Sequence, residues 1–470
     1  MKKMLMALSL SGALLGGSAV VWAEEAASTP ATEQTVAASD TVAETVTTVV
    51  AETTAPAEAV PAPEETPTAD TGDTAWILVS TALVLLMTIP GLALFYGGMV
   101  RKKNVLSTMM FSLSAAILVS LIWVIVGYSL AFSGSGAYVG DLAKAMLNGV
   151  AFDALSGTIP ESLFVIFQMT FAIITVAIIS GSIADRMKYS AFMAFIAIWV
   201  ILVYAPITHW VWAADGWLFK AGALDFAGGT VVHINAGVAG LVAAYMLGKR
   251  TGLGRESMAP HNLTLTVIGA SLIWVGWFGF NGGSALGAGA RASMAILVTQ
   301  VAAAAAAFSW LLVERLIRGK ASVLGGASGA VAGLVVITPA AGFVGVGGAL
   351  IMGLIGGVVC FWGITALKRL LKADDALDAF GLHAVGGIVG AVLTGIFYSD
   401  EIIKAAGVVL APTFAGQLWV QIEGVLATIV YSGVVTFIIL KVIDLVIGIR
   451  VSADDERMGL DLSQHGERIE

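Results

Sequence analysis

Eleven long apolar stretches, separated by short polar breaks, make up almost all of the sequence after Ala75. Each stretch is long enough to cross the hydrocarbon core of a bilayer as a helix, which takes about 20 residues. The sequence therefore predicts an all-α membrane protein with eleven transmembrane helices. The predicted spans are 76–99, 105–132, 161–183, 190–213, 227–247, 262–287, 292–315, 322–339, 344–367, 379–398 and 418–447.

The composition agrees with this assignment and excludes several classes of protein. With 58% apolar and 12% charged residues, the chain is too apolar for a water-soluble globular protein. The net charge of -8 reflects residues 24–73, which carry many carboxylates and no Lys or Arg, so it says nothing about the substrate and indicates no nucleic-acid partner. The single cysteine, Cys360, excludes an intramolecular disulfide and a thiolate metal cluster.

The basic residues of the breaks predict the orientation of the chain. Cytoplasmic loops carry an excess of Lys and Arg, and here every break after an odd-numbered span is basic. We therefore expect an external N-terminus and a cytoplasmic C-terminus, so that in the inner membrane of a bacterium the N-terminus would be periplasmic. The breaks after odd-numbered spans hold Arg101, Lys102, Lys103, Arg186, Lys188, Lys249, Arg250, Arg255, Arg315, Arg318, Lys320, Lys368, Arg369 and Lys372, and the others hold Lys144, Lys220, Arg291 and Lys404.

Residues 1–23 have the features of a signal peptide. Two lysines precede an apolar run from Met4 to Val21, and a small-residue cleavage site follows at Ala23. The alternative is an uncleaved anchor, although the run is near the lower length limit for a span. Residues 24–74 are rich in Ala, Thr, Glu, Val and Pro and contain no aromatic residue, which predicts a disordered periplasmic linker.

Two sequence matches suggest that the domain from 75 to 450 contains an inverted repeat. The run Gly91–Gly98 (GLALFYGG) in span one resembles Gly276–Gly283 (GWFGFNGG) in span six. His233 in span five and His383 in span ten are each followed by glycine four and seven residues later. Because the paired spans run in opposite directions, we expect two five-helix halves plus a final helix, with the functional site between the halves near the midplane.

Only two of the five histidines lie deep in predicted spans. His209 falls near an outer end, His261 in a cytoplasmic loop and His465 in the tail, which leaves His233 and His383. A titratable group at bilayer depth costs several kcal/mol and usually faces the interior of the bundle. Repeat symmetry brings these two together, where one imidazole can donate to the other.

Other roles for the two histidines are possible on sequence alone. Each could simply hydrogen-bond a neighbouring helix. A metal site is a further alternative, but no third buried ligand accompanies the pair, so we expect neither metal nor cofactor. The glycines that follow each histidine favour close packing of the helices that carry them. A pore or proton-relay role remains the main hypothesis.

Three runs of sequence resemble the ammonium transporters of the Amt/Mep/Rh superfamily. They are Gly222–Gly237 (GALDFAGGTVVHINAG), Gly276–Ala285 (GWFGFNGGSA) and Phe380–His383 (FGLH). The resemblance extends from Trp76 to the C-terminus. It implies a homotrimer in the lipid bilayer with one pore and eleven helices per subunit, an external N-terminus, and ammonium or ammonia as the substrate, with methylammonium as an analogue.

The same resemblance implies roles for individual residues. Phe167, Trp212 and Ser284 would form an outer recruitment site, where aromatic faces attract a cation and a hydroxyl accepts an N–H bond. Alternatively, Trp212 belongs to an interfacial belt and Ser284 only packs between helices.

Beneath the recruitment site, the resemblance implies a gate and a pore. Phe171 and Phe280 would form the gate, with Trp277 beside them, and the pore histidines His233 and His383 would follow. The phenylalanines could equally be core residues.

The cost of charge in an apolar pore suggests a mechanism. The sequence offers no ring of carboxylates or carbonyls to replace the water around a cation. We therefore expect NH4+ to lose its proton near the gate, to cross as NH3 and to be reprotonated inside, with or without relay of the proton along the histidine pair. Asp225, at the outer start of span five, is predicted to be structural, accepting backbone N–H bonds at a helix N-terminus rather than holding the cation.

The polar tail, residues 451–470, holds Gly459–Glu467 (GLDLSQHGE), which resembles the family's cytoplasmic tail that meets PII-type signalling proteins. A merely solvated tail is the alternative.

Parts of the sequence fit two other functions. Gly326–Gly329 (GASG), with Ser328, and His383 mimic motifs of rhomboid intramembrane proteases, but eleven spans are too many and we expect no enzyme. An ammonium sensor of the same fold is the other candidate, although the tail lacks an output domain.

Overall fold

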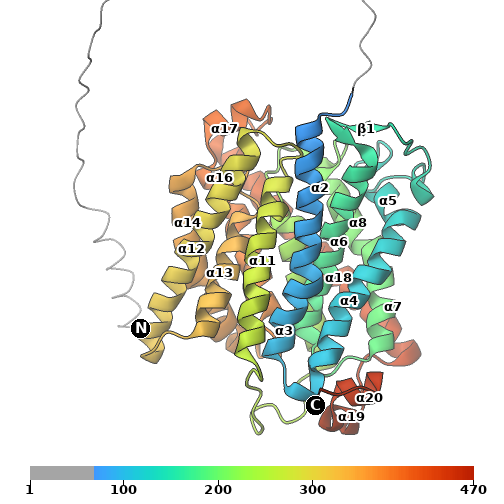
Figure 1. Cartoon of the computed structure of the whole chain (residues 1–470), viewed down its shortest axis with the longest axis vertical. Coiled ribbons are helices and arrows are strands. Elements are labelled where there is room, and N and C mark those ends of the chain that lie inside the picture. The colour runs from blue at the N-terminus through green and yellow to red at the C-terminus, as the bar shows by residue number, and fades with distance from the viewer. Residues whose placement is uncertain (1–67, 470) are drawn as a thin grey trace, which may run out of the picture. The chain divides into compact units, whose positions relative to one another are not determined.

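The computed structural model describes residues 68–469, so the expected signal peptide and most of the expected linker lie outside the described residues. The described chain is a bundle of long helices with one short hairpin, β1 (Leu155–Ser156) paired antiparallel with β2 (Ile159–Pro160) (Figure 1). The helices are α2 Thr71–Leu86, α3 Ala93–Met99, α4 Val105–Ile122, α5 Tyr128–Phe132, α6 Glu161–Ile183, α7 Tyr189–Trp199, α8 Ala205–Trp212, α9 Trp217–Lys220, α10 Asn235–Leu247, α11 Leu263–Gly283, α12 Ala290–Arg318, α13 Val323–Ile337, α14 Val346–Trp362, α15 Lys368–Leu371, α16 Val385–Phe397, α17 Asp400–Ala405, α18 Phe414–Ile447, α19 Ala453–Met458 and α20 Leu460–His465.

The bundle has two ends, which we name by what they carry. The hairpin end carries β1, β2 and α17, and the tail end carries α19 and α20 (Figure 1). Long helices run between the two ends, so a residue within the bundle can be placed by its depth between them.

Ten helical segments of the described chain are long and apolar enough to cross a membrane, one fewer than the sequence predicted. The difference lies at the eighth predicted span, 322–339, where α13 has only 15 residues. Fifteen residues rise about 22 Å, less than the roughly 30 Å of a hydrocarbon core. The helix ends at Ile337 because Pro339 has no N–H to continue it.

The first helix begins earlier than expected. The linker was predicted to extend to Thr74, but α2 starts at Thr71. The carboxylate of Asp70 caps it by accepting the backbone N–H of Asp73 at 2.8 Å. Asp73 in turn accepts the N–H of Ala288 at 2.7 Å, so the start of α2 is tied into the hairpin end of the bundle.

Several spans contain π-helical turns, in which the backbone hydrogen bonds span one residue more than in an α-helix. Met87–Leu92 joins α2 to α3 and contains Pro90. Gly229–Ile234 leads into α10, and Phe380–Ala384 leads into α16. Such turns widen the helix locally and are frequent at functional sites. These last two turns are the ones that carry His233 and His383.

The two histidine-bearing helices cross closely and reciprocally at glycines. A Cβ on Gly237 of α10 would fall 2.5 Å from the backbone N of Ala384, and a Cβ on Gly387 of α16 would fall 2.9 Å from Ile234. Ala384 follows one histidine and Ile234 follows the other, so the crossing involves corresponding positions of the two helices. Only glycine permits this separation, because any side chain would push the helices apart.

Charge pairs fix the loops at the tail end. The guanidinium of Arg250 donates to Asp374 at 2.8 Å, and Arg101 donates to Asp185 at 3.1 Å. Burial opposes the ionisation of Asp374, but hydrogen bonds and charge from Arg250 more than offset this and lower the pKa of its carboxyl. Arg250 also lies 3.7 Å from Asp185, so the two pairs form one cluster that holds four loops together.

The tail packs onto the bundle and is not simply solvated. The backbone N–H of Leu460 donates to Asn104 Oδ1 at 2.8 Å, and the carboxylate of Asp461 accepts the N–H of Ser107 at 2.7 Å. Leu460, Asp461 and Glu456 are all buried. The tail thus contacts the loops next to the charge cluster.

The glycine crossing generates a stability prediction. Gly237→Ala places a methyl group against the Ala384 backbone, so we expect it to destabilise the fold by about 1–3 kcal/mol and to lower the unfolding temperature in detergent. The matched control is Gly347→Ala on α14, where a Cβ meets nothing within 4 Å. An equal unfolding temperature for the two variants would contradict the role of the crossing.

Candidate functional site

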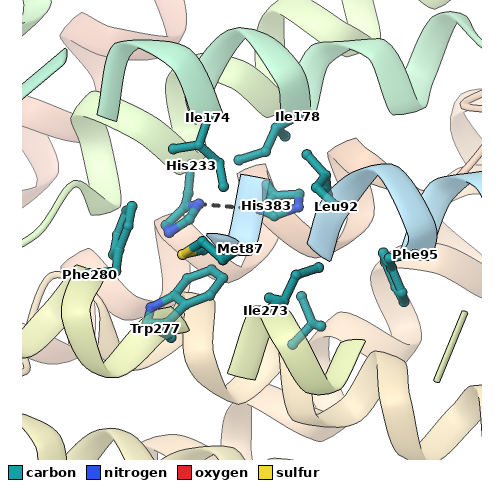
Figure 2. Close-up of a pocket in the computed structure, with 11 residues that line it drawn as sticks. Met87, Leu92, Phe95, Ile174, Ile178, His233, Ile273, Trp277, Phe280 and His383 are labelled. Atoms are coloured by element: carbon teal, nitrogen blue, oxygen red, sulfur yellow. Dashed lines mark hydrogen bonds between the residues drawn. The ribbon is translucent and has the colours of Figure 1, made fainter. Parts of the chain in front are cut away.

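The two predicted pore histidines meet in the middle of the bundle. His233 Nδ1 and His383 Nδ1 lie 3.2 Å apart, and the rings stack with centroids 5.3 Å apart and planes 24° apart. Both side chains are buried. Figure 2 shows them side by side, with Phe280 and Trp277 on the His233 side and Leu92 and Phe95 on the His383 side. The structure therefore forms the pair that the sequence repeat predicted.

The pair lies in a cavity with apolar walls. Apart from the histidines, the only lining side chain with a nitrogen or oxygen is Trp277, whose indole N–H is already bonded to Thr338. The imidazole nitrogens are thus the polar atoms that a small molecule in the cavity can use. The lining residues are Met87, Leu92, Phe95, Ile174, Ile178, His233, Ile273, Trp277, Phe280, Val331 and His383.

Two carboxylates hold the π-helical turns that carry the histidines. Asp225 accepts the backbone N–H groups of Gly228, Gly229, Thr230 and Val231 at 2.6–3.3 Å and also the Thr230 hydroxyl. Both of its oxygens accept hydrogen bonds from the start of the turn, which is the structural arrangement expected for this residue.

Asp375 does the same for the second turn. It accepts the N–H of Ala379 at 3.2 Å and that of Phe380 at 2.8 Å, and the hydroxyl of Ser182 donates to it at 2.7 Å. Our sequence reasoning missed this residue. The signal was present, because Asp375 precedes His383 by eight residues just as Asp225 precedes His233.

An unbroken series of aromatic contacts leads from the histidines toward the hairpin end. The indole of Trp277 stacks on His233 with centroids 5.3 Å apart and planes 16° apart. Phe280 lies 5.1 Å from Trp277 and 4.4 Å from Phe171. Phe171 in turn contacts Phe167 at 5.1 Å and Trp212 at 5.6 Å. The predicted gate residues Phe171 and Phe280 are therefore in contact with each other, and Trp277 lies beside Phe280.

The three predicted recruitment residues gather at the far end of this series. The ring of Phe167 lies against Gly283, the residue before Ser284, since a Cβ there would fall 2.8 Å from it. Trp212 is half-buried, and its indole N–H donates to the carbonyl of Asp225 at 2.8 Å. The hydroxyl of Ser284 donates to the carbonyl of Phe280 at 2.8 Å, which leaves its oxygen free to accept.

The histidine pair has a defined hydrogen-bonding capacity. In a neutral pair, one Nδ1 donates and the other accepts. The donating ring then has a bare Nε2 and the accepting ring a protonated Nε2. The pair thus offers the cavity one acceptor and one donor, and His233 Nε2 has no partner among the described residues. A small molecule that both donates and accepts hydrogen bonds suits this arrangement.

Comparison with known proteins identifies the family. The model of the Ammonium Transporter Family matches residues 75–469. The chain belongs to the ammonium transporter family. It is 52% identical over 399 residues to an ammonium transporter of Bacillus subtilis (strain 168), a match that covers 84% of this chain and 98% of that protein.

Solved structures of this family have the same fold. Candida albicans Mep2 is similar with a TM-score of 0.78 and 37% identity, covering 85% of this chain and 90% of that one. A protein described as a sensor Amt protein is similar with a TM-score of 0.78 and 30% identity, covering 84% of this chain and 98% of that one. The chain is accordingly a multi-pass membrane protein of the transporter family.

The capping carboxylate of this family member yields a testable expectation. Asp375→Ala leaves two backbone N–H groups and the Ser182 hydroxyl without their acceptor, so we expect a loss of about 1–3 kcal/mol in stability. Asp375→Asn keeps one acceptor oxygen and should lose less. Asp400→Ala, an exposed aspartate at the start of α17, is the control. If thermal unfolding of Asp375→Ala matched that of Asp400→Ala, the capping role would be wrong.

Proposed function

We propose that this protein moves ammonium across the membrane by binding NH4+ at the hairpin end and conducting it past the histidine pair as NH3. The observation that carries the proposal is the cavity itself, in which the histidine nitrogens are the available polar atoms within apolar walls. The B. subtilis relative, described as an ammonium transporter, supports the choice of substrate.

Recruitment of the cation is assigned to Phe167, Trp212 and Ser284. Aromatic faces attract a cation by roughly 0.5–2 kcal/mol. The Ser284 oxygen, whose proton is directed to the Phe280 carbonyl, can accept an N–H bond from ammonium. Such a site binds weakly, which suits a molecule that must leave it again.

Deprotonation is assigned to the level of the Phe171–Phe280 contact, where NH4+ gives its proton to water at the hairpin end. The NH3 that crosses takes up a proton from water again at the tail end. Below the Phe171–Phe280 contact, the cavity offers neither carboxylates nor a ring of carbonyls to replace the hydration shell of a cation. NH3 avoids this cost because it is neutral, and it accepts one hydrogen bond and donates others, as the histidine pair requires. Potassium cannot shed its charge and is refused.

The proposal includes a membrane topology. We infer eleven crossings, with α13 and the buried turn after it serving as the eighth, arranged as two inverted five-helix halves plus α18. The reciprocal contacts of Gly237 with Ala384 and of Gly387 with Ile234, and the matching Asp225 and Asp375 caps, support the repeat.

Orientation and partners follow from this topology and the family. The hairpin end faces the periplasm and the tail end the cytoplasm of a bacterial inner membrane, since the basic breaks lie at the tail end. We further propose a homotrimer, and a PII-type signalling protein as a partner of the packed tail.

Liposome transport tests the histidine role. In His233→Ala and His383→Ala, we expect methylammonium uptake and the ammonium-driven rise in lumenal pH to fall about tenfold, the effect of losing roughly 1.4 kcal/mol of hydrogen bonding in the cavity. His261→Ala, outside the cavity, is the matched control. Unchanged ammonium flux with unchanged rejection of potassium in both pore variants would overturn the proposal.

The purified protein used for the liposome assay also distinguishes transport from two other functions. The sensor Amt neighbour favours an ammonium sensor as the second candidate, and wild-type protein that binds ammonium without flux would point to it. A protease that uses Ser328 and His383 has less support, because His383 Nδ1 faces His233. Labelling of Ser328 by a fluorophosphonate probe would revive that function.

A further inference from the structure

The turn that ends the short helix α13 contacts three of the elements around the cavity: α11, the turn that carries His233, and α16. Thr338, its first residue, accepts the indole N–H of Trp277 at 2.9 Å. Pro339 lies against Gly229 and Gly390, where added Cβ atoms would fall 2.6 Å and 3.0 Å from its ring. One of these glycines begins the turn that carries His233, and the other lies in α16, which follows His383.

The orientation of the Thr338 hydroxyl is fixed. Its oxygen donates to the carbonyl of Leu334 at 2.7 Å, which uses its only proton. Indole nitrogen is a donor only, so the remaining lone pair of the hydroxyl holds Trp277. Both side chains are buried, and water does not compete for this bond.

Because Trp277 lines the cavity, holding its indole in place also holds that side of the cavity in place. The indole lies nearly parallel to the imidazole of His233 and 5.1 Å from the gate ring Phe280. Without the Thr338 hydroxyl, the side-chain polar atoms left for the indole N–H within the cavity are the imidazole nitrogens. An indole turned toward them would occupy the nitrogens that a passing molecule uses.

We propose that Thr338 is a positioning residue for conduction, holding Trp277 against His233 so that the imidazole nitrogens stay free for the passenger. It does not touch the passenger and acts through Trp277. The inference rests on the proposed function, in which NH3 uses those nitrogens.

Transport by variants of the full chain in liposomes tests the proposal. Thr338→Val removes the hydroxyl at constant shape. We expect the maximal ammonium flux to fall about tenfold, because a displaced Trp277 indole would obstruct the imidazole nitrogens that the passenger uses. The half-saturating ammonium concentration should stay the same, since the recruitment residues are untouched. Thr338→Ser keeps the hydroxyl and should restore flux to within about twofold of wild type.

A second comparison protects the test against a general packing defect. Trp277→Phe removes the N–H donor, so adding Thr338→Val to it should cause no further loss of flux. In ¹⁵N-indole-labelled protein, the Trp277 resonance, assigned by its absence in Trp277→Phe, should shift in Thr338→Val and not in Thr338→Ser.

Three results would count against the proposal. Wild-type flux in Thr338→Val, an unshifted Trp277 resonance in that variant, or a further tenfold loss in the double variant would each overturn it. If wild-type protein carried no ammonium at all, the proposed function would fail first and this inference with it. If the wild-type protein and Thr338→Val conducted ammonium equally well, the role of Thr338 would be wrong while the proposed function would stand.

Discussion

The contact between the two histidine-bearing helices is the constraint on which the rest of the site depends. Polar atoms in a membrane interior need partners, and His233 and His383 supply one for each other at 3.2 Å. That distance is reached only because Gly237 and Gly387 let the helices cross without intervening side chains. Close backbone approach and the hydrogen bond between the imidazoles are thus two aspects of one packing arrangement.

Breaking the regular helix at the histidines has a further physical consequence. A π-helical turn leaves backbone N–H groups at its start that water cannot reach, and Asp225 and Asp375 accept them. The carboxylates are therefore consumed by the backbone and add no free charge to the cavity. The cavity is therefore apolar except at the imidazole pair.

The aromatic series and the turn after α13 complete the same arrangement. Rings from α6, α8 and α11 contact one another from Phe167 down to Trp277, so the wall is continuous. The helix α13 stops short of a full crossing, and its end provides the hydroxyl that fixes the last of these rings. In the proposed mechanism, the shortness of α13 therefore serves the pore directly.

The sequence by itself determined the all-helical membrane class and the pairing of the two histidines, because apolar length, repeat spacing and titratable groups at bilayer depth can be read directly from the sequence. The sequence prediction made the eighth span too long, because hydropathy alone does not show that Pro339 ends a helix inside the bundle. It also missed Asp375 and Thr338. Only the tertiary structure decided which hydroxyl meets which indole and which carboxylate caps which turn, because those hydrogen bonds join helices whose relative positions depend on how glycine and aromatic surfaces pack.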